Sequence, residues 1–381
     1  MNITALTNLL SRKFRGASID DVQGVTNYTL FDEAAKNLLS KIDPFETVRH
    51  SEVDVFDGIY DYASPSDLKG KKILDIRPQV NRASYDNASQ TFTEDFDRDK
   101  EEQKFSVEFD EGTKFIRYRN SVGRSITVTE TTDDNWTATS GVTNIVEDTI
   151  LYVEDGMSLR FDVASGSNLL TWDGDSVIDL SDHTNKSTFF LWVYYPDSSL
   201  ITSLTIRVGS SASAYYEMTG SIHFGSIRNG WNLYKFSWNG ATETGTTLEA
   251  STDYVRLALV TTSADTDIRI GRLSSKLPSP HEFVYYSNCL FRPVSGSTWL
   301  TLPTVVTDIV NLDIEAEPLF INECCVLIAD DLQQYDESEK FRIKLDGTGE
   351  ELGMYDCYKR DKPSEAIRPQ TTYYKIRGIR K

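Results

Sequence analysis

The sequence predicts an α+β domain that is interrupted by an inserted all-β domain, an antiparallel β-sandwich. Between Thr188 and Arg272, short runs of β-branched and aromatic residues alternate with Gly, Asn, Asp, Ser and Pro, which is typical of short antiparallel strands. Apolar residues at helical spacing occur towards the two ends of the chain. We therefore assign residues 1–130 and 276–381 to one split domain and residues 131–275 to the inserted sandwich, because an exposed loop tolerates insertion.

The first part of the split domain is expected to contain two helices and then two strands. Apolar residues recur at helical spacing over residues 3–10 and 30–39. The dipeptide Asp43-Pro44 ends the second helix, because the residue before a proline disfavours the helical conformation. Alternation of apolar and polar residues over 51–60, and the apolar run over 72–77, predict the strands.

Residues 78–104 are polar and acidic, which is typical of an exposed loop or arm. Two short strands follow at residues 105–109 and 114–118, and the turn residues between them predict a β-hairpin. A third short strand is expected at residues 125–129, and a polar seam at residues 131–141 marks the front edge of the sandwich.

The predicted strands of the sandwich are the runs of the central segment that are bounded by turn residues. They cover residues 188–195, 201–208, 213–218, 230–238, 254–260 and 267–270. In the first run, successive side chains point to opposite faces, so one face carries Phe190, Trp192 and Tyr194 and the other carries Phe189, Leu191, Val193 and Tyr195. One of these faces must belong to the core.

After the sandwich, the punctuation Leu277-Pro-Ser-Pro-His281 marks a domain edge. Residues 319–329 then place Phe320, Cys324, Leu327 and Ile328 in helical register. The four cysteines lack a CxxC spacing, and the adjacent pair suits neither an ordinary disulfide nor a zinc knuckle. We therefore expect buried free thiols at Cys289, Cys324, Cys325 and Cys357.

Composition excludes several classes of protein. A chain of 381 residues is long for a single core, and its formal net charge of -19 argues against sequence-specific nucleic-acid binding. No apolar run approaches the roughly 20 residues of a membrane helix, and the first ten residues do not have the pattern of a secretory signal, so synthesis in a cytoplasm is expected. The chain ends in a basic tail that is either a solvated terminus or a dock for an acidic neighbour, including another copy. Its members are Lys359, Arg360, Lys362, Arg368, Lys375, Arg377, Arg380 and Lys381.

The sequence does not predict an enzyme. None of its four histidines stands in an HExxH, GxSxG or metal-ligand spacing, and no phosphate-binding GxxxxGK[ST] loop is present. Acidic pairs such as Asp173 with Asp175 are more typical of turns or cation ligands than of glycosidase carboxylates. No cofactor is expected, although a structural calcium ion could find oxygen ligands at predicted loop ends. These candidate ligands are Asp155, Asp253, Asp265 and Asp267.

Several segments of the predicted sandwich together resemble the carbohydrate-binding-module type of jelly roll found in structural proteins of tailed bacteriophages. They are residues 156–162, 178–183, 188–194, 201–209, 230–232, 240–245 and 253–256, about a third of the chain. The flanks resemble phage proteins of the neck and tail region. This second resemblance lies in residues 61–67, 289–293, 308–313, 362–367 and 373–375.

The resemblance implies a non-enzymatic virion structural protein, made in the host cytoplasm. As a head-to-tail connector or neck adaptor it would form a ring with its own copies and contact portal or tail proteins, with the jelly roll facing outward. The alternative is a glycan- or receptor-binding module on the tail or capsid surface, anchored by its flanking domain. An aromatic face exposed on the sandwich would favour this alternative.

Candidate site residues follow from these two hypotheses. Glycan binding needs aromatic rings beside polar groups, and the candidate platform is Trp192, Tyr194, Tyr215, Tyr216 and Trp238, whereas Trp231 is assigned to the core. Aromatic residues of a sandwich are more often core or interface than platform. Ring assembly needs apolar helix faces and complementary charges. Its candidate contacts are Phe320, Leu327, Ile328, Lys375, Arg377 and Arg380.

Overall fold

The computed structural model describes residues 1–14, 28–78, 105–110, 112–118, 123–132, 134–295, 298–348 and 351–361. The chain divides into two compact units. The helical unit consists of Met1–Ser51, Pro65–Arg77 and Phe283–Lys381, and the sandwich unit consists of Glu52–Ser64 and Pro78–Glu282. An α+β part with an inserted all-β part is thus confirmed, while the predicted limits at residues 130 and 275 stay predictions.

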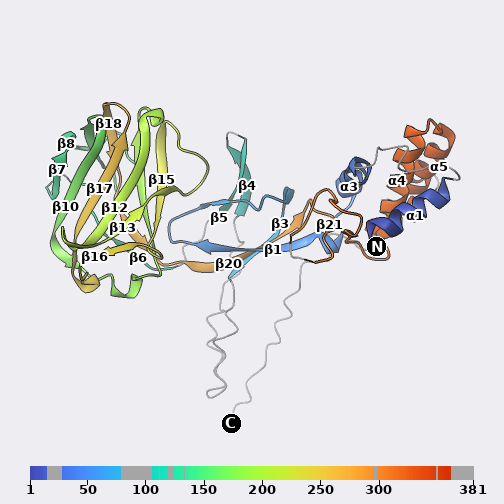
Figure 1. Ribbon diagram of the computed structural model, residues 1–381, viewed down its shortest axis with the longest axis horizontal. Helices are drawn as coiled ribbons and strands as arrows, with labels where there is room; N and C mark the ends of the chain where they lie inside the picture. Colours follow the sequence, from blue (N-terminus) through green and yellow to red (C-terminus); the bar gives the residue numbers. More distant parts are fainter. Residues whose placement is uncertain are drawn as a thin grey trace, which may run out of the picture. The chain divides into compact units, whose positions relative to one another are not determined.

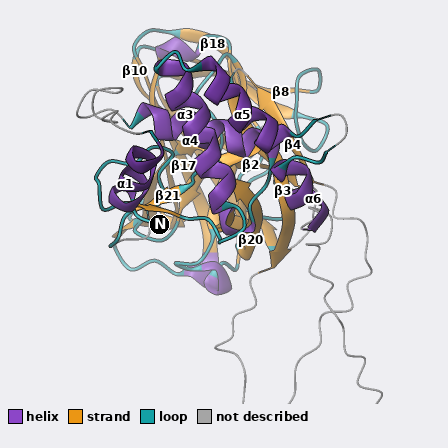
Figure 2. Ribbon diagram, turned by 90° about the vertical axis from the view of Figure 1, so that its right-hand side faces the viewer, coloured by secondary structure: helices purple, strands orange, loops and turns teal. Residues whose placement is uncertain are grey.

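The helical unit is built around α4, because α1, α3 and α5 all pack against it (Figure 2). Pro318 lies in its first turn, where the missing amide proton is not needed. Both helices predicted near the N-terminus and the one predicted over residues 319–329 are confirmed. The helices are α1 (Ile3–Lys13), α3 (Thr29–Lys41), α4 (Glu317–Asp331), α5 (Tyr335–Asp346) and α6 (Met354–Asp361).

Phe320 and Ile328 of α4 are fully buried in the core of the helical unit. A side chain without exposed surface cannot contact a neighbouring copy, so the prediction that these two residues are assembly contacts is wrong. Leu327 is half-buried and packs against the same core. The remaining predicted contacts, Lys375, Arg377 and Arg380, lie outside the described residues.

The sandwich unit contains two antiparallel sheets of the jelly-roll type (Figure 1). One sheet has the strand order β16-β13-β12-β17-β10-β7, and the other has the order β14-β15-β11-β18-β9-β8, with β19 paired to β11 and β6 paired to β19. The strands are β6 (Ser125–Thr127), β7 (Trp136–Ser140), β8 (Val142–Asp148), β9 (Ser158–Val163), β10 (Gly166–Ile178), β11 (Thr188–Tyr195), β12 (Ile201–Ser211), β13 (Ala214–Thr219), β14 (Ser221–Ile222), β15 (Gly230–Ser237), β16 (Thr242–Thr244), β17 (Thr252–Thr261), β18 (Asp265–Ile270) and β19 (Ser274–Lys276).

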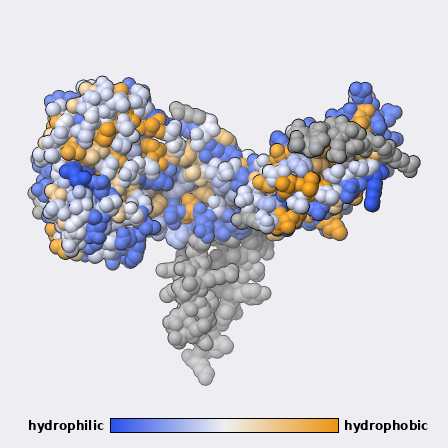
Figure 3. Space-filling view, viewed as in Figure 1, coloured by the Kyte–Doolittle hydropathy of each residue, from blue (hydrophilic) through white to orange (hydrophobic). Residues whose placement is uncertain are grey.

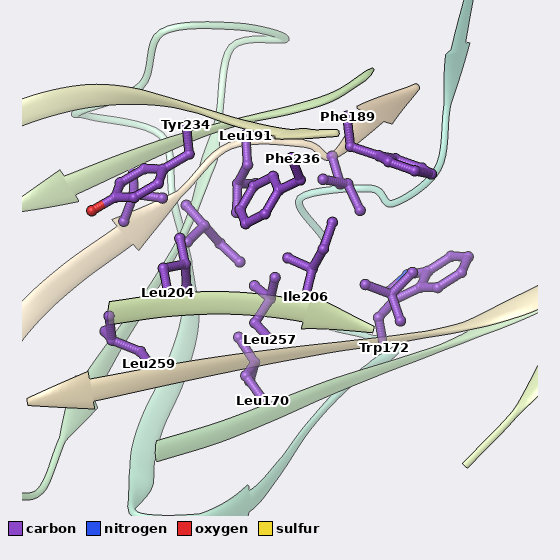
Figure 4. Packing of buried hydrophobic residues seen from close by; sticks show 14 of the residues in the cluster. Leu170, Trp172, Phe189, Leu191, Leu204, Ile206, Tyr234, Phe236, Leu257 and Leu259 are labelled. Atoms are coloured by element: carbon purple, nitrogen blue, oxygen red, sulfur yellow. The ribbon is translucent and has the colours of Figure 1, made fainter. Parts of the chain in front are cut away.

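The core of the sandwich lies between these sheets, where side chains from both point toward one another (Figure 4). In β11 the inward residues Phe189, Leu191, Val193 and Tyr195 are at most 1% exposed. Because successive side chains of a strand point to opposite faces, Phe190, Trp192 and Tyr194 lie on the outer face. The predicted division of this strand into two faces is therefore confirmed, and its core face is the one that begins at Phe189.

Three smaller sheets complete the fold. The predicted hairpin is confirmed and forms the sheet β2-β5-β4 in the sandwich unit, another sheet has the order β1-β20-β3, and β21 pairs with β22. Their strands are β1 (Val48–Val55), β2 (Asp61–Ala63), β3 (Leu68–Pro78), β4 (Phe105–Asp110), β5 (Thr113–Tyr118), β20 (Ser279–Ser287), β21 (Phe291–Arg292) and β22 (Ile309–Val310). Short 3-10 helices occur at Phe45–Thr47, Ser181–His183, Ser198–Leu200 and Glu249–Ser251.

The strand predicted over residues 51–60 is shorter in the structure, because β1 ends at Val55 and a tight turn follows. The hydroxyl of Tyr62 closes this turn: it accepts a hydrogen bond from the amide of Phe56 at 3.0 Å and donates one to the carbonyl oxygen of Ile59 at 2.6 Å. The turn leaves the side chain of Tyr60 47% exposed.

Candidate binding site

The outer face of β11 and β15 carries a group of aromatic side chains. Tyr194 and Trp231 are paired across the two strands, and their ring centroids lie 5.6 Å apart in an edge-to-face arrangement. Trp192 precedes Tyr194 by two residues on β11, so it lies on the same face of the sheet, and it is paired with Leu233 of β15. Both tryptophans are only half-buried, so this face offers indole surface outside the core.

A second part of the sandwich unit covers one end of this outer face. Phe56, in the turn after β1, packs on Phe190 of β11 with ring centroids 4.9 Å apart, and His223 packs on the same Phe190 ring at 5.4 Å. Phe224 in turn contacts Phe115 of the hairpin at 4.8 Å. The turn, the hairpin and the loop before β15 are therefore held against the sheet by aromatic contacts.

A cavity of about 190 Å³ lies where these three parts meet the sheet. Every residue that lines it belongs to the sandwich unit. Its walls combine aromatic surface with polar groups that can form hydrogen bonds, the combination expected of a small-molecule site. The aromatic, charged and polar residues that line the cavity include Tyr60, Asp61, Asp110, Thr113, Trp192, His223, Phe224, Arg228, Trp231 and Asn232.

The loop that presents Trp231 is fixed by Asn232, whose side chain is 4% exposed. Its Oδ1 accepts a hydrogen bond from the amide of Arg228 at 2.9 Å, and its Nδ2 donates to the carbonyl oxygens of Arg228 and Gly230 at 2.7 and 2.9 Å. Gly230 has a φ of 98°, a conformation that glycine adopts without strain. The buried amide therefore fixes the backbone from Arg228 to Gly230, directly before Trp231.

Charges at the cavity are paired within the protein. Arg228 donates a hydrogen bond from Nη1 to Oδ2 of Asp110 at 2.6 Å, which ties the loop before β15 to the hairpin. Asp61 accepts two hydrogen bonds from Arg117, at 2.7 and 3.0 Å. Since each carboxylate has a guanidinium partner, neither ion is left alone at the cavity wall.

His223 has one ring nitrogen in use and one without a partner. Its Nε2 lies 2.8 Å from the carbonyl oxygen of Asp61, which can only accept, so Nε2 carries the proton and Nδ1 is an acceptor. Burial lowers the pKa of His223 to about 4, so the ring is neutral near pH 7. Nδ1 of His223 and Nε1 of Trp231 are both buried without a hydrogen-bond partner in the described structure.

The predicted aromatic platform is not assembled as expected. Trp192 and Tyr194 lie on the outer face of β11, as described above. Trp238 and Tyr216 are 1% and 7% exposed and belong to the sandwich core, so their assignment to an exposed platform is wrong. Tyr215 lies on the other sheet and is 9% exposed beneath Arg207, whose guanidinium carbon is 4.4 Å from the ring centroid. The five residues therefore do not form one surface.

Trp231 is the reverse case, since the sequence analysis assigned it to the core and the structure places it at the cavity. The signal lay in strand alternation: Trp231 and Trp238 are separated by an odd number of positions, so they point to opposite faces. Tyr234 and Phe236 share the face of Trp238, whereas Lys235 shares that of Trp231. His223 and Arg228 were not predicted, because their role depends on contacts with distant segments.

The acidic residues considered as calcium ligands are not gathered into one site. Asp155 pairs with Arg272 at 2.8 Å and Asp267 with Arg160 at 3.4 Å. Within the described ranges, no group of three or more His, Cys, Asp or Glu side chains could hold a metal ion. A structural calcium ion thus stays a prediction without a set of ligands among these residues.

Two further predictions concern the thiols and the membrane. All four cysteines are free; three are buried and Cys357 is half-buried, so the expectation of complete burial is wrong for that residue. Among the residues described, none of the helices has the length and apolar character needed to span a membrane.

No model of a known family and no curated protein matches the sequence. Solved structures that are similar to part of this chain include the family 30 carbohydrate-binding module of a Clostridium thermocellum cellulosomal cellulase, 9% identical with a TM-score of 0.32, over 40% of this chain and 96% of the module. A xylan-binding domain from Paenibacillus barcinonensis is 16% identical with a TM-score of 0.25, over 40% of this chain and 92% of that domain. An agarase is 10% identical with a TM-score of 0.29, over 41% of this chain and 25% of the agarase.

Proposed function

We propose that this protein binds a glycan without catalysing its cleavage, and that the cavity of the sandwich unit is the binding site. The observation that carries the proposal is the combination, in one cavity, of half-buried indole rings from Trp192 and Trp231 with polar side chains that can form hydrogen bonds, among them Asp61, Asp110 and Thr113. A sugar presents C–H faces that pack on aromatic rings and hydroxyl groups that both donate and accept hydrogen bonds. The cavity offers a counterpart to each.

A glycan is preferred to a purely apolar ligand because the lining also includes the polar side chains of Asp61, Asp110 and Thr113. An apolar ligand would cover polar surface without a compensating hydrogen bond, whereas the hydroxyl groups of a sugar can donate to the carboxylates. The aromatic walls in turn favour a ligand with apolar patches over a small ion.

Binding should be tested with a glycan array, followed by calorimetric titration of the strongest ligand. Thr113→Trp places a large side chain at the cavity, because Thr113 is exposed at the start of β5 and lines the site. Thr242→Trp is the matched control, since Thr242 is also an exposed threonine on a short strand but does not line the cavity. We expect binding to be lost in Thr113→Trp and kept in Thr242→Trp. An array without any bound saccharide would overturn the proposal.

We further propose, from the sequence resemblance to phage neck and tail proteins, that the helical unit holds the protein in a virion. In that role it would contact its own copies in a connector ring, or portal or tail proteins. The helical unit exposes large apolar side chains that such contacts could bury, among them Val305, Val306 and Ile314, which is 86% exposed. Figure 3 shows hydrophobic residues gathered on one face of this unit.

The test of this second proposal is the mass of the purified protein by light scattering, alone and after mixing with a virion lysate depleted of it. A closed oligomer or incorporation into particles supports a virion component. A stable monomer that does not associate with the particles overturns the virion role, and the glycan-binding proposal is unaffected by that result.

A further inference from the structure

We infer that the C-terminal segment of this chain, residues 362–381, folds back and occupies a second cavity, which lies in its own helical unit. The inference depends neither on glycan binding nor on attachment to a virion, because the segment and this cavity both belong to the helical unit. Four observations carry it: the apolar surface exposed at the cavity, the place where the segment begins, its composition and its charge.

The cavity has a volume of about 590 Å³ and is lined by the start of α4, the end of α5, α6 and the connection between α5 and α6. Its lining includes Leu319 and Tyr358 of the core, and also Ile343 and Leu352, which are 44% and 62% exposed. Single exposed apolar residues are common, but exposed apolar residues that line one concave site indicate a binding surface. This cavity therefore suits an occupant with apolar side chains.

The C-terminal segment begins beside this cavity. Helix α6 lines the cavity through Cys357, among other residues, and ends at Asp361. The position of α6 is fixed, because the hydroxyl of Tyr355 donates a hydrogen bond to Oε1 of Glu323 on α4 at 2.5 Å. The roughly 12 residues up to Tyr373 can span about 40 Å, whereas α6, with 8 residues, is about 12 Å long. The later part of the segment can therefore reach the cavity of its own chain.

Attachment to α6 favours the chain's own segment over the segment of a second copy. A segment that is tethered beside its site has an effective concentration of the order of millimolar. The same segment on another molecule, at about micromolar protein concentration, competes at a disadvantage of about 1,000-fold for the same contacts. The fold-back is therefore the arrangement that we infer.

The second half of the segment has the apolar side chains that this cavity can take. Tyr373, Tyr374, Ile376 and Ile379 occur there among basic residues. A side chain of this kind that enters the cavity removes its own apolar surface, and that of the cavity wall, from water. Such burial is favourable roughly in proportion to the area removed.

The charge of the segment is opposite to that of the rest of the chain. Residues 362–381 contain six Lys or Arg and one Glu, a formal charge of +5, so the other residues sum to -24 where the whole chain has -19. At the cavity itself, the described lining contains the carboxylates of Glu315 and Glu351 and the ammonium group of Lys344. Complementary charge favours this contact and helps to orient it.

The thiol of Cys357 can report whether the cavity is occupied, because it lines the cavity and is the one cysteine of the four that is not buried. The test measures the rate at which the native full-length chain reacts with dithionitrobenzoate, with Cys357→Ser to show that the buried thiols do not contribute. Removal of residues 362–381 should raise this rate by about 10-fold or more. Loss of one buried apolar side chain already corresponds to about that change in an equilibrium constant.

Two pairs of full-length variants locate the contact. Ile376→Asp should raise the rate as the truncation does, whereas Thr371→Asp adds the same charge outside the apolar part of the segment and should not. Leu352→Asp should also raise the rate, whereas Tyr335→Asp, at an exposed apolar residue that does not line the cavity, should not. In the chain without residues 362–381, Leu352→Asp should leave the rate unchanged.

The outcomes decide between the chain's own segment, a second copy and no occupant. Faster reaction of the truncated chain at an unchanged mass by light scattering supports the fold-back, as does renewed protection by a synthetic peptide of residues 362–381. Equal rates in the full-length and truncated chains overturn the inference, and so does a wild-type rate in full-length Leu352→Asp. A mass that falls to that of the monomer on truncation, together with faster reaction, assigns the cavity to a neighbour's segment and overturns the fold-back.

Discussion

Replacement of Trp231 by alanine should weaken glycan binding by up to about 20-fold. An aromatic side chain can bury about 200 Å², and no more than about a third of Trp231 is exposed in the protein, so about 70 Å² is left for a ligand. At about 25 cal/mol per Å² this contact contributes about 1.8 kcal/mol, which corresponds to about 20-fold in Kd. The variant should also lose stability, by about 3 kcal/mol for the ring area that is buried in the protein and about 0.5–1.5 kcal/mol for the contact with Tyr194.

The assay is calorimetric titration of wild type and variant with the same glycan, beside thermal unfolding to show that the fold is kept. For a unit of this size a loss of 1 kcal/mol lowers Tm by about 2–4 °C. Tyr215→Ala is the matched control, because it removes an aromatic ring from the outer face of the other sheet. Wild-type affinity in Trp231→Ala, or a greater loss of affinity in Tyr215→Ala, would refute the reasoning.

Two further predictions concern stability. The pKa of His223 is about 4 in the folded state and near 6.5 in the unfolded chain, so the unfolded chain binds more protons between these two pH values. The free energy of unfolding should therefore fall by at most about 3 kcal/mol as the pH drops from 6.5 to 4. His223→Gln should flatten this decline in a series of urea unfolding curves, and an unchanged pH profile would contradict the assignment. Phe320→Ala should cost the helical unit about 3–5 kcal/mol in urea unfolding. Tyr335→Ala, at a residue 67% exposed, should cost less than about 0.5 kcal/mol, and equal losses in the two variants would argue against a buried Phe320.

Much of the fold could be predicted, because its elements follow from local patterns. Apolar spacing located α1, α3 and α4, and β11 has the predicted limits Thr188–Tyr195. The strand predicted over residues 51–60 failed at its end, because the turn there depends on the hydroxyl of Tyr62, which lies beyond the strand. The alternation of apolar and polar residues within a strand gives no information about a side chain beyond the strand that stabilises the turn at its end.

The site was harder to predict than the fold. Alternation identified the outward position of Trp192, but it does not say which outer face will be covered by another part of the chain. The cavity needs Asp61 beside His223, although they are 162 positions apart in the sequence. Trp231 and Trp238 were assigned to the wrong faces because each was considered alone, whereas their neighbours Tyr234 and Phe236 show the direction of the core.

The most direct test of glycan binding in the cavity is the NMR signal of the Trp231 indole N–H during titration with the glycan selected by the array. Its resonance can be assigned by its absence from Trp231→Phe. We expect this signal to shift in proportion to the bound fraction, while that of Trp238, buried in the core, stays in place. Saturable binding that leaves the Trp231 signal unmoved would contradict the assignment of the cavity as the binding site.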